Sequence, residues 1–235
     1  MDAVKKDTTT PKIRNILTAF KKRRRVQQIT MGVSFLIILV GGWLVSPLLG
    51  YFLIVCVVVA MGIGFSRGRK WCDWYCPRGS FYDAMMAPMS PSKKIPKIFK
   101  GLPLRIGVLS IFMTIVTIQI IKRWPDVYKI GEFFVILLTV TTAIGVVFSF
   151  IFHYRTWCCF CPVGSMTNWI GKNKYPLMIN SEQCIDCKLC EKTCPMQIKP
   201  YAYRNETVRQ VADGDCLKCN LCVKACPSMT LSFRE

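Results

Sequence analysis

The chain has 235 residues, of which 52% are hydrophobic, and it carries 32 lysines and arginines against 13 acidic residues. A single soluble domain is excluded, because four apolar runs hold much of this hydrophobic content. The runs cover residues 29–45, 49–65, 106–121 and 133–152, and none has a charged residue in its interior. Each has about the length of a bilayer-spanning helix. Backbone groups in lipid must satisfy one another, so we expect four transmembrane helices.

The basic residues are distributed unevenly around these runs. Residues 1–28 contain nine lysines and arginines, the loop between the second and third runs contains nine, and the loop between the first two contains none. This asymmetry is typical of a positive-inside topology. We expect a basic cytoplasmic tail at 1–28, cytoplasmic termini, and a multi-pass protein of a prokaryotic cytoplasmic (inner) membrane. The charge then serves contact with anionic membrane lipid, and a nucleic-acid partner is excluded.

The first run has no secretory cleavage site after it, so it is expected to be a retained helix. Together the four runs define a membrane domain at residues 29–170.

Residues 171–235 differ from the membrane domain in that they contain two cysteine blocks of the form C-x2-C-x2-C-x3-C-P. The first block is Cys184, Cys187, Cys190 and Cys194, and the second is Cys216, Cys219, Cys222 and Cys226. This spacing is that of a bacterial ferredoxin with two clusters, in which the fourth cysteine of each block ligates the other cluster. A structural zinc site uses separated cysteine pairs and fits this pattern badly.

The ligand sets are therefore expected to be crossed. One [4Fe–4S] cluster is expected on Cys184, Cys187, Cys190 and Cys226, and the other on Cys216, Cys219, Cys222 and Cys194. The C-terminal segment is predicted to be a two-cluster ferredoxin domain.

A second kind of cysteine motif follows each pair of apolar runs. Residues 72–80 read CDWYCPRGS, and residues 157–165 read WCCFCPVGS. A unit of two helices and a Cys-Pro motif is thus repeated, with both motifs on the same side of the membrane. Parallel repeats of this kind are related by an axis along the membrane normal, which would make the two motifs face each other.

Three interpretations of the motif cysteines remain open. In the first, four of the five bind iron as a third iron–sulfur cluster at the membrane edge. In the second, the thiols are redox-active or bind metal only during assembly. In the third, they are structural, and Cys-Pro-x-Gly turns the chain into an interfacial helix. The five candidates are Cys72, Cys76, Cys158, Cys159 and Cys161. The second motif is one residue shorter, which leaves the choice between Cys158 and Cys159 open, whereas Cys56 is expected to be a packing residue.

Other cofactors are not indicated. The one histidine, His153, cannot form a bis-histidine haem site, and no Cys-x2-Cys-His motif is present. His153 is expected to be a solvated interfacial residue. No glycine-rich fingerprint for a flavin or nucleotide follows a strand pattern. We identify no catalytic residue.

The four apolar runs, the two Cys-Pro motifs and the ferredoxin blocks together resemble the NapH/MauN family of ferredoxin-type membrane proteins. They are also similar to the membrane domain of NosR-like polyferredoxin proteins. The eight ferredoxin cysteines match the family pattern, as do Cys72, Cys76 and Pro77. Cys158, Cys161 and Pro162 match less well, because the usual family motif has three residues between its cysteines.

The resemblance implies electron transfer between the quinone pool and a redox partner in anaerobic respiration. We expect an electron-transfer subunit of a larger complex rather than a stand-alone enzyme, with membrane lipid, a redox protein and quinone as partners. The alternative is an accessory factor that supplies electrons for metalloenzyme assembly or activation.

Overall fold

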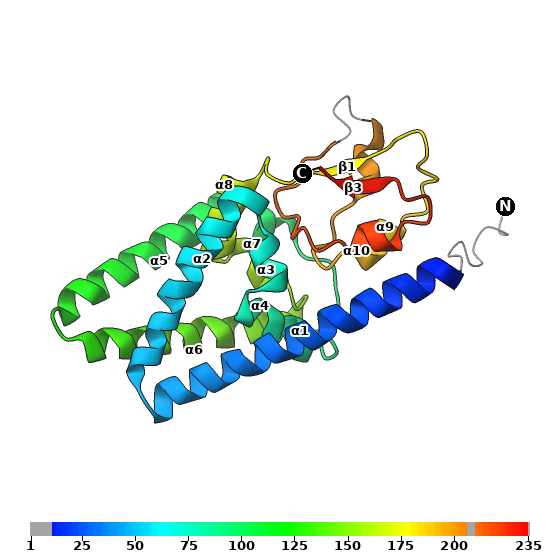
Figure 1. Cartoon of the computed structure of the whole chain (residues 1–235). Coiled ribbons are helices and arrows are strands. Elements are labelled where there is room, and N and C mark those ends of the chain that lie inside the picture. Colours follow the sequence, from blue (N-terminus) through cyan, green and yellow to red (C-terminus); the bar gives the residue numbers. More distant parts are fainter. Residues whose placement is uncertain (1–10, 206–209, 235) are drawn as a thin grey trace.

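The computed structural model describes residues 11–205 and 210–234 (Figure 1). Its four longest helices are α1 (Pro11–Leu44), α2 (Phe52–Arg67), α5 (Leu102–Arg123) and α6 (Val127–Ile151). All four are long and apolar enough to cross a membrane. Aliphatic side chains project outward from all four helices, as a surface that faces lipid requires. The chain is therefore a membrane protein.

Helix α6 and the turn that leads into α2 have closely apposed backbones at the end away from the C-terminal domain. There a 3₁₀ helix, η1 (Pro47–Tyr51), leads into α2 and lies against α6. A Cβ atom at Gly131 would lie 2.6 Å from the Pro47 carbonyl oxygen, and one at Gly50 would overlap the Gly131 carbonyl oxygen. Glycine at both positions allows this approach, which is how small residues commonly bring membrane helices together.

Short helices follow each long pair at the opposite end. After α2 come α3 (Lys70–Trp74), α4 (Pro77–Phe81) and the π-helical turn η2 (Tyr82–Met86). After α6 come α7 (Thr156–Phe160) and α8 (Pro162–Gly171). A proline begins both α4 and α8, where its missing N–H is not needed and its fixed φ suits a helix. The Cys-Pro dipeptide thus ends one short helix and starts the next in both motifs.

Helix α1 is longer than the first apolar run. It begins at Pro11, so residues 11–28 of the predicted basic tail form a continuous helix with the first membrane span. Residues 1–10 of that tail lie outside the described residues. Lysine, arginine and glutamine are good helix formers, so the basic segment can extend the apolar helix.

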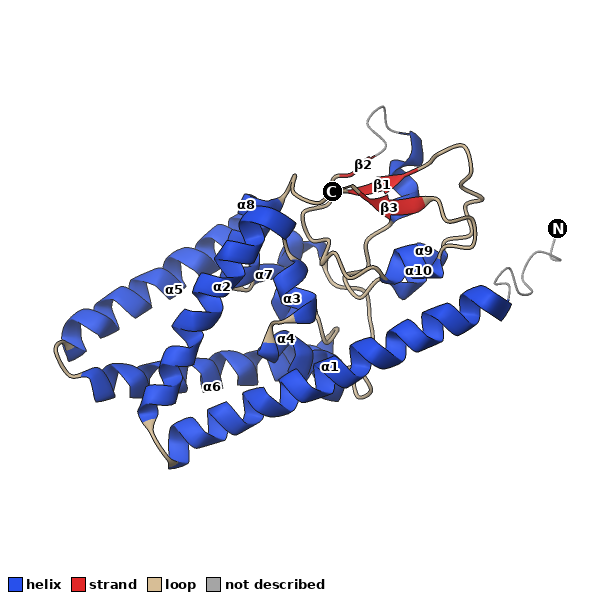
Figure 2. Ribbon diagram, viewed as in Figure 1, coloured by secondary structure: helices blue, strands red, loops and turns tan. Residues whose placement is uncertain are grey.

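The C-terminal domain contains the described strands, as Figure 2 shows. They are β1 (Leu177–Ile179), β2 (Gln210–Val211) and β3 (Leu231–Phe233), in the order β2-β1-β3 with both pairings antiparallel. Helix α9 (Leu189–Thr193) carries Cys190, and helix α10 (Leu221–Ala225) carries Cys222. The 3₁₀ helix η4 (Pro200–Asn205) follows the first block.

The C-terminal domain rests on the motif-bearing end of the helices and on the N-terminal part of α1, which packs against α10 (Figure 1). The loop before α5, which includes the 3₁₀ helix η3 (Lys97–Lys100), also contacts it. There the Ile95 N–H donates to Gln197 Oε1 at 2.9 Å, and Lys100 Nζ donates to the Met196 carbonyl oxygen at 2.7 Å. These contacts place the cysteine blocks next to the membrane-edge motifs.

Candidate iron–sulfur sites

The structure gathers the ferredoxin cysteines into the two crossed sets that the spacing predicts. One cavity of about 20 Å³ is lined by four cysteines that we call the outer set: Cys184, Cys187, Cys190 and Cys226. A second cavity of about 20 Å³ is lined by four that we call the inner set: Cys194, Cys216, Cys219 and Cys222. In each set one cysteine comes from the opposite block, which brings the two halves of the domain together.

The inner set is the one closer to the membrane helices. Burial and then the charge of Asp73, on α3, raise the pKa of the Cys219 thiol. Burial also raises the pKa of the Cys216 thiol, and the guanidinium of Arg69 is among the groups that oppose this rise. Burial raises the pKa of the Cys194 thiol to about 11, although the Ile198 N–H, 3.5 Å from its sulfur, opposes this. Bare thiolates are thus costly here, and binding to iron is what makes buried cysteines favourable as anions.

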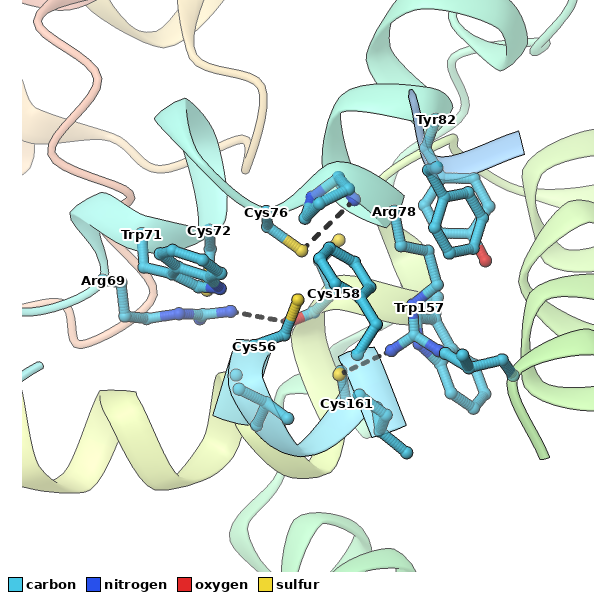
Figure 3. Close-up of a pocket in the computed structure, with 18 residues that line it drawn as sticks. Cys56, Arg69, Trp71, Cys72, Cys76, Arg78, Tyr82, Trp157, Cys158 and Cys161 are labelled. Carbon is cyan, nitrogen blue, oxygen red and sulfur yellow. Dashed lines mark hydrogen bonds between the residues drawn. The ribbon is translucent and has the colours of Figure 1, made fainter. Parts of the chain in front are cut away.

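A third cavity lies between the two Cys-Pro motifs. Its volume is about 70 Å³, larger than either ferredoxin cavity, and Figure 3 shows its lining. The motif cysteines that line it, here called the membrane-edge set, are Cys72, Cys76, Cys158 and Cys161. Cys56 on α2 also lines this cavity, a position that its apolar sequence context did not signal. Each of the two motifs thus contributes two thiols to the membrane-edge set.

Cys159 is the motif cysteine that does not line this cavity. Its side chain is fully buried, and its Sγ lies 3.7 Å from the Arg155 carbonyl oxygen. Burial and then the charge of Asp215 raise the pKa of the Cys159 thiol to about 12. The geometry thus favours Cys158 over Cys159 as the partner of Cys161.

Hydrogen-bond donors point at three sulfurs of the membrane-edge set, the longest contact being that of Arg155 Nη1 with Cys158 Sγ at 3.8 Å. The Gly79 N–H donates to Cys76 Sγ at 3.3 Å, because Cys76 is the N-cap of α4. Arg78 Nη2 donates to Cys161 Sγ at 3.2 Å and so joins the first motif to the second. Donors of this kind stabilise thiolate sulfur and tune the potential of a cluster bound to it.

Two arginines cross between the motifs in a reciprocal manner. Arg69 Nη2 donates to the Cys158 carbonyl oxygen at 2.6 Å, and Arg155 Nη1 donates to the Cys72 carbonyl oxygen at 3.0 Å. Both arginines are buried. The Arg-x-Trp-Cys sequence shared by the two motifs was a signal of this arrangement that the cysteine spacing alone did not reveal.

The glycine of each motif leaves room for the crossing arginine and for the carbonyl group to which that arginine donates. A Cβ at Gly79 would lie 2.8 Å from the Cys72 carbonyl oxygen and 3.3 Å from Arg155 Nη1. A Cβ at Gly164 would lie 2.9 Å from Arg69 Nη2 and 3.1 Å from the Cys158 carbonyl oxygen. The Gly-Ser ending of both motifs thus leaves room for the arginine of the other.

Two buried acids balance the charge around the first motif. Asp73 lies 2.5 Å from Arg24 Nη2, and Asp83 lies 2.5 Å from Arg155 Nη2 and 2.7 Å from Arg24 Nη2. Gln28 also donates to Asp83. These contacts tie the basic part of α1 to the first motif, which sequence analysis did not anticipate.

The expectation that His153 is solvated is wrong. Its side chain is only 5% exposed, because the segment after α6 folds under the loop before α5, where the Lys93 N–H donates to the Phe152 carbonyl oxygen. The Arg155 N–H donates to His153 Nδ1 at 3.1 Å. Burial and then the charge of Arg155 lower the pKa of His153 to about 4, so it is neutral at physiological pH.

The donor sets fit clusters better than single metal ions. A tetrahedral zinc site, with Zn–S bonds near 2.3 Å, brings its sulfurs to about 3.8 Å from one another. Within residues 11–205 and 210–234, no three His, Cys, Asp or Glu side chains form a group that could hold one metal ion. Four thiols around a cavity suit a cubane, because each sulfur binds a different iron.

Family comparisons assign iron–sulfur binding to both parts of the chain. A family described as a 4Fe-4S binding domain matches residues 49–97 and 134–177, and each of these segments contains one Cys-Pro motif. A family described as a 4Fe-4S dicluster domain matches residues 183–231. The chain therefore contains 4Fe-4S ferredoxin domains, which carry out iron–sulfur electron transfer. No solved structure matches the chain.

Two similar proteins come from Methanocaldococcus jannaschii. Uncharacterized protein MJ0749 is 27% identical over 150 residues, which cover 62% of this chain and 59% of that protein. Uncharacterized protein MJ0750 is 30% identical over 159 residues, which cover 63% of this chain and 67% of that protein. The chain belongs to the family of MJ0750. It spans less than two thirds of MJ0749, and neither relative's name states an activity.

Proposed function

We propose that the chain is a membrane-anchored electron-transfer protein with three iron–sulfur clusters. The outer and inner sets would each hold a [4Fe–4S] cluster, and the membrane-edge set would hold a third. Such clusters accept and donate single electrons at potentials set by burial, charge and hydrogen bonds to sulfur. The observation that carries this proposal is that four cysteines from two distant motifs line one cavity.

The two other interpretations of the motif cysteines explain less of this geometry. A structural role accounts for the turn at Cys-Pro-x-Gly but not for the convergence of Cys72, Cys76, Cys158 and Cys161. Redox-active thiols are typically accessible, whereas Cys72, Cys158 and Cys161 are buried. All fourteen cysteines are free. The 4Fe-4S family match over both motifs supports the cluster.

We place the two motifs about a pseudo-twofold axis along the membrane normal, on the cytoplasmic side of a prokaryotic inner membrane. The reciprocal contacts of Arg69 and Arg155 support the axis. The basic residues of α1 and of the loop before α5 lie at the same end as the motifs and support the orientation (Figure 1).

We further propose that electrons pass between membrane quinol, or a membrane partner, and a redox enzyme, as the resemblance to the NapH/MauN family implies. The apolar lining of the membrane-edge cavity supports an approach from the membrane. Phe35 comes from α1, Phe52 and Leu53 from α2, and Leu138 from α6. The ferredoxin domain would then face the redox enzyme in a larger complex.

The proposal is tested with the full chain purified anaerobically in lipid nanodiscs. A short-chain quinol is added, and reduction of the ferredoxin clusters is followed by visible absorbance and EPR. We expect reduction in the wild type and in Cys159→Ser. In Cys76→Ser we expect reduction by dithionite but not by the quinol.

A wild type that quinol leaves oxidised, but that forms a stable complex with one apo-enzyme, would contradict the quinol route. That result would favour the accessory role in metalloenzyme assembly.

A further inference from the structure

One buried carboxylate of the ferredoxin domain enters the membrane part. Asp215 is 4% exposed and lies 2.6 Å from Arg69 Nη1 and 2.6 Å from Arg105 Nη2. Asn168 Nδ2 donates to Asp215 Oδ1 at 3.0 Å. The three partners come from the segment before α3, from α5 and from α8. A single side chain thus joins three elements of the membrane part.

The position of Asp215 corresponds to an acid that the second motif lacks. When the motifs are aligned on Arg69 and Arg155, with a one-residue gap between Cys159 and Cys161 that also aligns the two Cys-Pro dipeptides, Asp83 aligns with Asn168. Arg155 takes its carboxylate from Asp83 of the first motif. At the corresponding place the second motif has the neutral Asn168, which donates to Asp215, and Asp215 supplies the negative charge that faces Arg69.

Arg69 connects this carboxylate to the membrane-edge set. One of its terminal nitrogens donates to Asp215, and the other donates to the Cys158 carbonyl oxygen at 2.6 Å. Asp215 directly precedes Cys216 of the inner set. Asp215 is the acid in ion-pair contact with Arg69 and Arg105 within the described residues, and its removal would leave two buried cations without that contact, which is strongly unfavourable.

We propose that Asp215 is a positioning residue that completes the membrane-edge site from the ferredoxin domain. Docking of that carboxylate holds Arg69 against the Cys158 carbonyl group and so fixes the second half of the four-cysteine site. The inference rests on the proposed third cluster only for the identity of the group held there.

The other contacts between the two parts agree with this docking. They involve Met196 and Gln197, which follow Cys194, and α10, which carries Cys222. A Cβ at Gly214 would overlap the Asn168 side chain. The contacts that join the domain to the membrane part thus lie beside the inner set, which leaves the outer set on the far side.

The test uses the full chain with Asp215→Asn, the double variant Asn168→Asp/Asp215→Asn, and Asp213→Asn as a matched control. In that control the amide oxygen of the new side chain can still accept the hydrogen bond that Asp213 accepts from the Asp215 N–H. The first readout is iron per chain with the EPR spectrum of the membrane-edge site. We expect Asp215→Asn to lose about four irons, one cubane's worth, and to keep both ferredoxin signals. The double variant, which returns the carboxylate to the aligned position, is expected to regain the iron.

A second readout does not depend on a third cluster. Trypsin can cut at Lys172 and Lys174, the exposed lysines between α8 and β1. We expect cleavage there to be at least about tenfold faster in Asp215→Asn than in Asp213→Asn. Wild type with only two clusters would refute the third cluster, and the cleavage rates would still test the docking. Asp215→Asn with wild-type iron, EPR spectrum and cleavage would overturn the inference.

Discussion

The first motif contains its own acids, whereas the second motif takes its acid from another domain. Asp73 and Asp83 lie within the first motif region and face Arg155 and Arg24. The aligned positions of the second are Cys159 and Asn168, which carry no charge as a free thiol and an amide. The same helical turn and the same crossing arginine are thus built twice, with different sources of negative charge.

This difference indicates how the two halves depend on the rest of the chain. The first motif needs α1, because Arg24 shares Asp73 and Asp83 with Arg155. The second motif needs the ferredoxin domain, because the arginine that crosses to it is Arg69, and the acid that faces Arg69 is Asp215 of that domain. Substitutions at matched positions should therefore have unequal effects.

The largest expected effect is that of Arg155→Leu. It leaves Asp73 and Asp83 buried with only Arg24 as a cation, and breaking a buried ion pair in this way costs about 3–5 kcal/mol. Arg69→Leu should cost less, because Arg105 still faces Asp215. Thermal unfolding followed by tryptophan fluorescence would measure both.

Lys129→Ala, which removes the exposed pair with Asp126, serves as the control and should cost less than about 1 kcal/mol. Equal losses for Arg155→Leu and Arg69→Leu would contradict the unequal charge supply of the two motifs.

The two motif glycines give the next comparison. Gly79→Ala should destabilise the protein by about 2–3 kcal/mol, because the new Cβ would meet a backbone carbonyl oxygen at 2.8 Å. Gly164→Ala should cost about 1–2 kcal/mol, because the nearest atom is the end of the Arg69 side chain. Chemical unfolding of the two variants under one set of conditions ranks them. A larger loss for Gly164→Ala would show that Arg69 is held more rigidly than the Cys72 carbonyl group.

A change in stability between pH 7.5 and 5 should come from His153, in the second half. His153 precedes Arg155 by two residues and is buried, whereas the aligned Arg67 is exposed. The pKa of His153 is about 4 in the folded protein, below its value of about 6.5 in an unfolded chain. As the pH falls, His153 is therefore protonated first in the unfolded state. The contribution of neutral His153 to folding stability is present above about pH 6.5 and is lost progressively below it.

At pH 5 the free energy of unfolding should be about 2 kcal/mol lower than at neutral pH because of His153. His153→Gln should remove that part of the pH dependence between pH 7.5 and 5, as unfolding at each pH would show. An unchanged slope in His153→Gln would refute the assignment.

The smallest expected effect concerns Arg78, whose aligned residue in the second motif is Val163. Both line the membrane-edge cavity, but only Arg78 donates to a cysteine sulfur. Arg78→Met removes a positive charge and a hydrogen bond, so the one-electron potential of a cluster there should fall by about 60 mV. Val163→Met is the control without a charge change. An EPR redox titration in which the two variants titrate together would argue against this role.

Much of the ferredoxin part could be predicted from sequence. The crossed cysteine sets follow from short, local spacings, and the structure brings together the same residues around its two cavities. The four spans were predictable because lipid demands long apolar runs. The extension of α1 was missed, because its charges are balanced by acids that lie far away in the chain.

The membrane-edge site was predictable only in part. Cys158 and Cys159 are neighbours in α7, where successive residues point about 100° apart, so a shift of one residue decides which of them faces the cavity. Spacing cannot settle that choice, because it depends on how α7 packs. The pairing of Arg69 with Asp215 spans 146 residues and has no local signature.

In the proposed arrangement, both motifs contribute cysteines to one cluster. Iron and acid-labile sulfide per chain, measured with EPR on the full protein, test it most directly. We predict about twelve irons for the wild type and for Cys159→Ser, and about eight for Cys76→Ser and for Cys161→Ser. About eight irons in the wild type, unchanged in Cys76→Ser, would contradict the claim.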